Sequence, residues 1–169
     1  MNFYFAKLKH RVRGILFSPP KTWESMKQES GNTIETLVFL FVCCLIPGLL
    51  TLVRGFTGWM SEIFIPFFAV FVSSILIRFL KPIRRISWEV NFNLLVYSFF
   101  PLFWCYALSH IFNYRQYFLP FGLLYSMILL FVGCKKSMNI SFWQCLSLVV
   151  KIVLLLLFCL YLFMVPLSG

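Results

Sequence analysis

The chain has 169 residues and a net charge of +10, yet only 12% of its residues are charged and 61% are hydrophobic. Soluble globular domains contain about a quarter charged residues, so this composition excludes an ordinary soluble domain. The charged residues lie mostly in the gaps between five long runs that are apolar on every side, whereas strands of a membrane barrel alternate apolar and polar residues. We therefore expect an all-α, polytopic membrane protein with a five-helix transmembrane bundle.

Residues 1–17 are predicted to form a basic amphipathic helix that lies on the membrane. At about 100° per residue, five apolar side chains share one face of this helix: Phe5, Leu8, Val12, Ile15 and Leu16. Four cations are expected to meet anionic lipids of the cytoplasmic leaflet: Lys7, Lys9, Arg11 and Arg13. The alternative is a frayed tail that only supplies positive charge. Nucleic-acid binding is not expected, because membrane topology explains the distribution of the cations.

The next segment is predicted to be a short second helix over about residues 20–29. Serine is a favoured N-cap and proline fits the first helical turn, so the Ser18-Pro19-Pro20 run suits this start. Pro19 and Trp23 are candidate contacts for a protein partner. Asn32, with Glu35 three residues later, resembles a capping box that begins the first span. We expect a cytoplasmic tail over residues 1–33 and a transmembrane domain over residues 34–169.

Five membrane-spanning helices are predicted, because a span needs about 20 mostly apolar residues. Their expected ranges are 34–53, 59–80, 90–112, 117–134 and 142–166. Alternating the two sides places twelve Lys and Arg residues on one side and only Arg54 and Arg115 on the other. Basic loop residues favour the cytoplasm. We therefore expect a cytoplasmic N-terminus and a C-terminus on the far side.

Residues suited to catalysis are scarce. The chain has no Asp, and its two His residues lie in the tail (His10) and near the outer end of the third span (His110). The H-E-x-x-H, G-x-S-x-G and P-loop patterns are missing. The six Cys residues contain no C-x-x-C pair and are interpreted as small hydrophobic residues of the spans. We expect no enzymatic activity, no cofactor and no metal site.

One cation is predicted inside a span. Lys151 lies about nine residues into the last run, roughly 13 Å from its start at the rise of a helix, and ionisable groups at such depth are costly. Its side chain either extends back to the cytoplasmic surface or pairs inside the bundle. The possible partners are Glu35, Glu89, Asn91 and Asn93. Pro47 and Pro101 fall near the middle of their spans, where proline kinks a helix.

Two segments resemble the Yip1 family of membrane proteins. Residues 16–30 (LFSPPKTWESMKQES) are similar to the segment before the first span in bacterial members, with an S-P-x-x-x-W-x-x-x-K-x-E pattern matched by Ser18, Pro19, Trp23, Lys27 and Glu29. Residues 96–122 resemble the third span, turn and fourth span, and the matching positions are Tyr97, Ser98, Pro101 and Gly122, with Gly133 and the KK after it fitting the fourth gap. The resemblance implies five spans and the orientation given above. The tyrosine- and glycine-rich motif of the eukaryotic members that associate with Rab GTPases is absent, so that role is not implied.

Three functions are compatible with the sequence. The leading hypothesis is a non-enzymatic scaffold or partner-binding module of the bacterial inner membrane, acting in membrane organisation or trafficking through its cytoplasmic tail and an unknown protein partner. The first alternative is a small transporter or channel subunit that uses kinked helices and Lys151. The second is a protein that binds anionic lipid or senses curvature through its basic tail.

Overall fold

The computed structural model describes residues 2–28, 33–50, 56–80, 87–112 and 115–164. These residues form seven α-helices and one 3₁₀ turn, and they contain no strand. The helices are α1 (Asn2–Phe17), α2 (Pro19–Gln28), α3 (Thr33–Leu50), α4 (Phe56–Leu76), α5 (Trp88–Phe112), α6 (Arg115–Met138) and α7 (Phe142–Met164), with the 3₁₀ turn η2 (Ile77–Phe79) after α4. The predicted all-α fold is confirmed.

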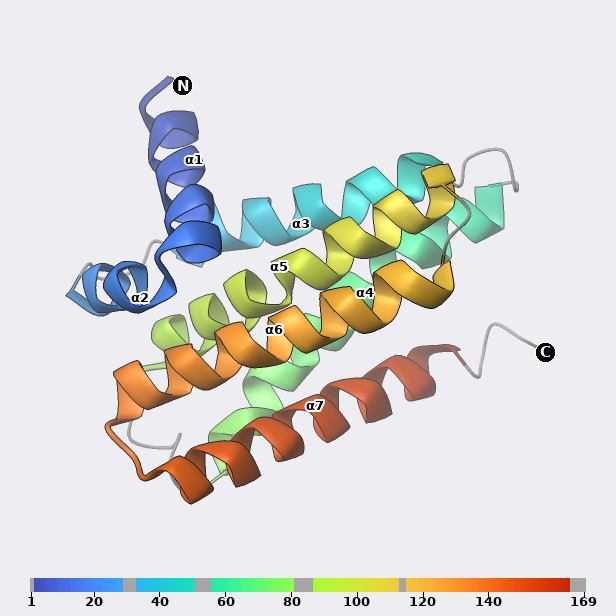
Figure 1. Ribbon diagram of the computed structural model, residues 1–169. Coiled ribbons are helices and arrows are strands. Elements are labelled where there is room, and N and C mark those ends of the chain that lie inside the picture. Colours follow the sequence, from blue (N-terminus) through green and yellow to red (C-terminus); the bar gives the residue numbers. More distant parts are fainter. Residues whose placement is uncertain (1, 29–32, 51–55, 81–86, 113–114, 165–169) are drawn as a thin grey trace.

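The five long helices α3 to α7 form a bundle in which consecutive helices run in opposite directions (Figure 1). Short connections require this arrangement, because they leave no length for a crossover. Helix α1 runs across the bundle axis at the end where α3 begins, and α2 lies at the same end (Figure 1). We call this the hairpin end, after the pair α1–α2. Helix α7 ends at the opposite end of the bundle.

Helix α5 is the centre of the bundle. It packs against α3, α4 and α6, and every residue from Asn91 to Pro101 is buried. It is also the least apolar of the four helices that are long and apolar enough to cross a membrane. Polar side chains within a membrane face protein rather than lipid. The polar residues Asn91, Asn93 and Ser98 therefore explain why α5, and not a more apolar helix, occupies the centre.

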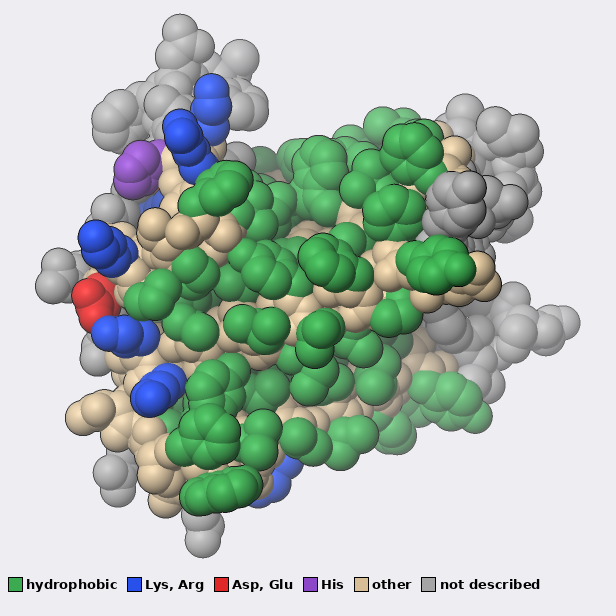
Figure 2. Space-filling view, in the orientation of Figure 1, with side chains coloured by type: hydrophobic (Ala, Val, Ile, Leu, Met, Phe, Trp, Pro, Cys, Tyr) green, Lys and Arg blue, Asp and Glu red, His purple; other side chains and the backbone are tan. Residues whose placement is uncertain are grey.

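The outer helices present apolar side chains to their surroundings. Hydrophobic side chains cover the side of the bundle that Figure 2 shows. The exposed large hydrophobic residues include Val38 and Phe41 on α3, Leu124 on α6, and Leu154 and Phe158 on α7. A contiguous apolar surface of this extent is far larger than water-soluble monomers expose. It matches the hydrocarbon of a bilayer, and the chain is therefore an integral, multi-pass membrane protein.

The long helices follow the ranges expected for the spans, with differences of a few residues at their ends. Segments of α3, α5, α6 and α7 are long and apolar enough to cross a membrane. In the second of the five apolar runs, the described apolar segment, Ile63–Phe79, is shorter. Pro47 and Pro101 lie inside helices that continue through them. The helices are therefore bonded on both sides of each proline, unlike the broken helices that transporters use.

Side-chain caps fix the connection between α6 and α7. Asn139 follows α6 with φ 50°, a left-handed conformation that Asn tolerates at a helix C-terminus, and its amide donates to the Lys135 carbonyl at 3.1 Å. Ser141 and Gln144 then form a reciprocal capping box. The Gln144 amide donates to Ser141 Oγ at 3.4 Å, and the Ser141 amide donates to Gln144 Oε1 at 3.3 Å. These contacts start α7 at Phe142, as the sequence predicts.

Candidate functional site at the hairpin end

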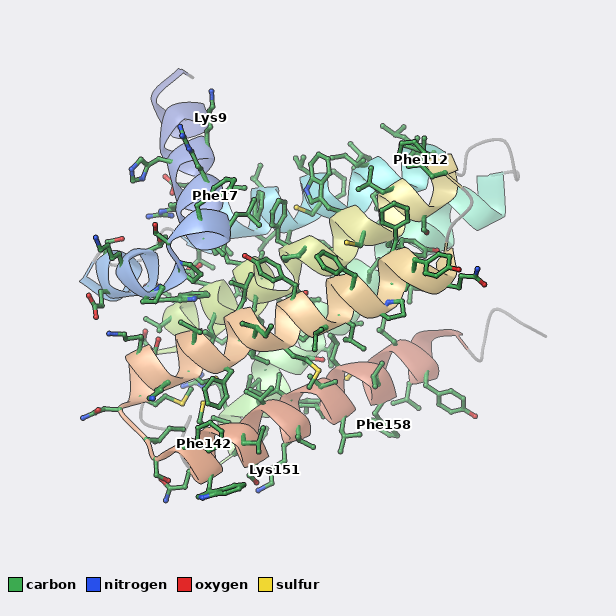
Figure 3. The ribbon with its side chains drawn as sticks, viewed as in Figure 1. Lys9, Phe17, Phe112, Phe142, Lys151 and Phe158 are labelled. Atoms are coloured by element: carbon green, nitrogen blue, oxygen red, sulfur yellow. The ribbon has the colours of Figure 1, made fainter. Side chains whose placement is uncertain are left out.

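Most of the cations whose side chains are described gather at the hairpin end, whereas the side of the bundle is largely apolar, with Lys151 on α7 as an exception (Figures 2 and 3). Lys9, Arg13 and Lys21 on the hairpin are exposed, and so are Lys135 and Lys136 at the end of α6. Pro19 is half-buried. The side chain of Lys7 lies outside the part of the chain that the structure describes. This end of the molecule is thus the polar surface to which a water-soluble partner has access.

Arg11 does not lie on that surface, although the helical periodicity of α1 predicts a membrane-facing cation. Its side chain is only 7% exposed and pairs with Glu35 at the start of α3, with 3.3 Å between Arg11 Nη1 and Glu35 Oε2. The prediction for Arg11 is wrong because α1 folds back against α3 and brings a carboxylate over its polar face. Glu35 thereby acts as the partner of Arg11. The Asn32 half of the expected capping box lies outside the described residues.

A polar cluster continues from this ion pair into the bundle. Thr36 and Asn93 form a buried hydrogen bond between α3 and α5 in which the Thr36 hydroxyl meets Asn93 Oδ1. Tyr97, one turn after Asn93, is buried as well, and its hydroxyl group has no hydrogen-bond partner among the described residues. The Tyr97 ring stacks on Phe39 with 5.0 Å between the ring centroids. The cluster therefore joins α1, α3 and α5 at one point.

Trp23 is buried, which corrects its prediction as a contact for a protein partner. Its side chain is 3% exposed and packs between α2 and the bundle. The fit depends on Gly133 of α6, because a Cβ atom at that position would come within 2.9 Å of Trp23 Cε2 and would also meet the Leu94 side chain of α5. Trp23 therefore anchors the hairpin to this protein's own core, and a partner has no access to it in this structure.

Two further contacts link the hairpin to α6. The Tyr125 hydroxyl donates to the Leu16 carbonyl near the end of α1, at 2.8 Å. Lys136 Nζ lies 2.6 Å from Glu24 Oε1 on the outside of α2. With the Arg11–Glu35 pair and Trp23, these contacts hold both helices of the hairpin against α3 and α6. Tyr125 and Glu24 could not be predicted from the sequence pattern, because their partners are more than a hundred residues away.

The Glu24–Lys136 pair predicts a pH dependence of hairpin docking. The hydrogen bond from Lys136, and then its positive charge, lower the pKa of Glu24 below its ordinary value of 4.5. A lowered pKa in the folded state stabilises the protein above pH 4.5, and this contribution is lost as the pH falls through the lowered pKa. The difference in melting temperature between the wild type and Glu24→Gln should be present at pH 7 and vanish in acid. An equal difference in melting temperature at all pH values would contradict this prediction.

Lys151 lies on the outer face of α7 and points away from the bundle (Figure 3). No hydrogen bond or ion pair joins it to another described residue. Of its possible partners, Glu35 contacts Arg11 and Asn93 contacts Thr36, while the fully buried Asn91 amide has no hydrogen-bond partner among the described residues. Lys151 therefore lies outside the bundle, and the extension of its side chain to the cytoplasmic surface stays a prediction.

Lys151→Leu should consequently leave the protein folded. Surface substitutions without a structural partner change the free energy of unfolding by at most about 0.5 kcal/mol, and leucine suits an outer face in lipid. Thermal unfolding of the purified variant would measure the change. A loss of folded protein comparable to that caused by Arg11→Leu would show that Lys151 has an internal partner.

The described residues offer little for catalysis. They contain no group of three or more His, Cys, Asp or Glu side chains that could hold a metal ion. The six Cys residues are buried and unbridged. Cys145 Sγ donates a hydrogen bond to the Phe131 carbonyl at 3.3 Å, which links α7 to α6. The described features of the hairpin end are therefore its exposed cations and the docking of α1 and α2 against the bundle.

The bundle, its apolar sides and its docked amphipathic hairpin define a polytopic helical membrane protein. The family model of the Yip1 domain matches residues 13–164 of the chain, and the chain belongs to this family. The match covers the end of α1, the whole of α2 and the five long helices. No curated protein and no solved structure matches the chain.

Proposed function

We propose that this protein is a non-enzymatic scaffold of the bacterial plasma membrane that presents its hairpin end to the cytoplasm. The observation that carries the proposal is the fixed docking of a basic hairpin. Arg11, Trp23 and Leu16 contact the bundle, while Lys9, Arg13 and other cations remain exposed. A surface held in one conformation loses little entropy when a partner binds.

The charge of this surface indicates an acidic partner. The exposed cations of α2 and of the end of α6, Lys21 and Lys135, lie at the same end of the bundle, and the nearby Lys136 is already paired with Glu24. Complementary charge accelerates association and sets specificity. The proposed partner is therefore a protein with an acidic segment at the membrane surface, and the positive-inside distribution of Lys and Arg supports a cytoplasmic location of this end.

Site-specific photocrosslinking in native membranes tests the proposal. A photoreactive residue at position 21 or 135 should give discrete adducts with a cytoplasmic protein. The matched control is position 150 on the outer face of α7, which should give lipid adducts only. The adducts at position 21 should weaken when Lys135 is replaced with glutamate, and those at position 135 should weaken when Lys21 is replaced with glutamate. Equal adducts at positions 21 and 150, or adducts insensitive to charge reversal, would contradict the proposal.

The transporter alternative receives no comparable support. Its two motivating features were kinked helices and Lys151, but Lys151 is exposed on α7, and α3 and α5 continue through Pro47 and Pro101. The lipid-binding alternative is supported by a specific cleft on the side of the bundle, and it is compatible with a scaffold.

A further inference from the structure

A cleft of about 370 Å³ lies where α1 crosses the side of the bundle. Its apolar walls come from α3 and α5, and α1 closes it at the hairpin end. The lining residues of α1 are Lys9, Val12, Arg13, Leu16 and Phe17, those of α3 are Phe39, Val42, Cys43 and Ile46, and those of α5 are Phe100 and Trp104. In Figure 3, Lys9 and Phe17 lie on the same side of α1.

The cleft separates charge from apolar surface along its length. Among the described residues, the charged ones that line it are Lys9 and Arg13, and both are exposed. The wall from Phe39 to Ile46 covers eight residues of α3, a rise of about 10 Å along the helix. Glu35, the nearest carboxylate in the sequence of α3, pairs with Arg11 and does not line the cleft. The cleft thus has a cationic mouth above an apolar channel.

The orientation of the cleft matches that of a lipid. Helix α1 crosses the bundle axis at the hairpin end (Figure 1), so it lies along the plane of the membrane surface when α3 and α5 cross the bilayer. Lys9 and Arg13 are then at the depth of lipid headgroups, and the channel between α3 and α5 descends into the hydrocarbon. Lys and Arg are the usual ligands of phosphate oxygens, and an apolar channel fits an acyl chain.

We propose that this cleft binds one anionic phospholipid, with its phosphate at Lys9 and Arg13 and an acyl chain against Val42, Ile46 and Trp104. Binding at this site differs from the general adsorption of a basic tail to anionic lipid, because binding at the site requires the two cations and also the apolar channel. It adds a ligand to the scaffold and does not depend on a protein partner.

Native mass spectrometry of the detergent-purified protein, titrated with defined lipids, tests the site. The wild type should retain one phosphatidylglycerol more tightly than phosphatidylcholine. Each basic residue near an anionic surface contributes about 1 kcal/mol, so Lys9→Gln with Arg13→Gln should weaken phosphatidylglycerol binding about thirtyfold. The control pair, Lys21→Gln with Lys135→Gln, removes the same charge outside the cleft and should leave binding unchanged. Equal losses for both pairs would overturn the proposal.

A second variant tests the channel separately from the charge. Val42→Trp fills the cleft from α3, at a side chain that is already 43% exposed, so the fold should tolerate it. It should abolish retention of the lipid, while Val150→Trp on α7 should have no effect. Glycerol phosphate, which has the headgroup chemistry without acyl chains, should not displace the lipid at millimolar concentration. Displacement by glycerol phosphate, or full retention by Val42→Trp, would show that the cleft is not an acyl-chain site.

Discussion

Replacing Arg11 with glutamine should lower the free energy of unfolding by about 3–5 kcal/mol, the usual cost of removing one partner of a buried ion pair. Glu35 would keep its charge in a site where its side chain is only 19% exposed. The change should also loosen the docking of α1 on α3, because the Arg11–Glu35 pair joins these two helices. Thermal or denaturant unfolding in detergent without added lipid would measure the loss.

Arg13→Gln is the matched control for this prediction. It removes the same charge two residues away on an exposed face of α1, so its effect in lipid-free detergent should stay within about 0.5 kcal/mol. The double variant Arg11→Leu with Glu35→Leu should be more stable than either single variant, because no unpaired charge remains in the site. Equal effects of Arg11→Gln and Arg13→Gln would show that the buried pair does not stabilise the fold.

Replacing Trp23 with alanine should cost about 3–5 kcal/mol, as expected for a large aromatic side chain removed from a packed site. Trp23 fills the space between α2 and Gly133 of α6, and no other described side chain of α2 is buried so completely. We expect the hairpin to undock, and a protease should then cleave the chain between α1 and α3 faster than in the wild type.

Trp143→Ala provides the comparison. Trp143 follows the capped start of α7 and is 76% exposed, so its removal leaves no cavity. The free energy of unfolding should change by about 0.5 kcal/mol or less. If the two tryptophan variants were equally stable and equally resistant to protease, Trp23 would not anchor the hairpin.

The apolar runs were enough to predict the helices of the bundle, because the length needed to cross a bilayer is fixed and few alternatives satisfy the backbone there. The start of α7 was also predictable, since Ser141 and Gln144 are neighbours in sequence. The central place of α5 could have been inferred from the polar residues Asn93 and Ser98, which lipid would exclude.

The docking of the hairpin could not be predicted in the same way. Periodicity assigns Arg11 to a polar face of an isolated helix, but its environment is set by Glu35, twenty-four residues later. The role of Trp23 depends on Gly133, where the absence of a side chain makes room for the indole. Such contacts depend on how the hairpin folds back onto the bundle, and the pattern of polar and apolar residues along the sequence does not specify this fold.

The arrangement of the termini tests the account most directly. The topology predicted from the sequence has five crossings, with the hairpin end in the cytoplasm and the end of α7 on the opposite side of the membrane. Reporter fusions, one ahead of α1 and one after α7, should show cytoplasmic activity at the first site and far-side activity at the second. Activity of both fusions in the same compartment would contradict the five-helix bundle as a transmembrane structure.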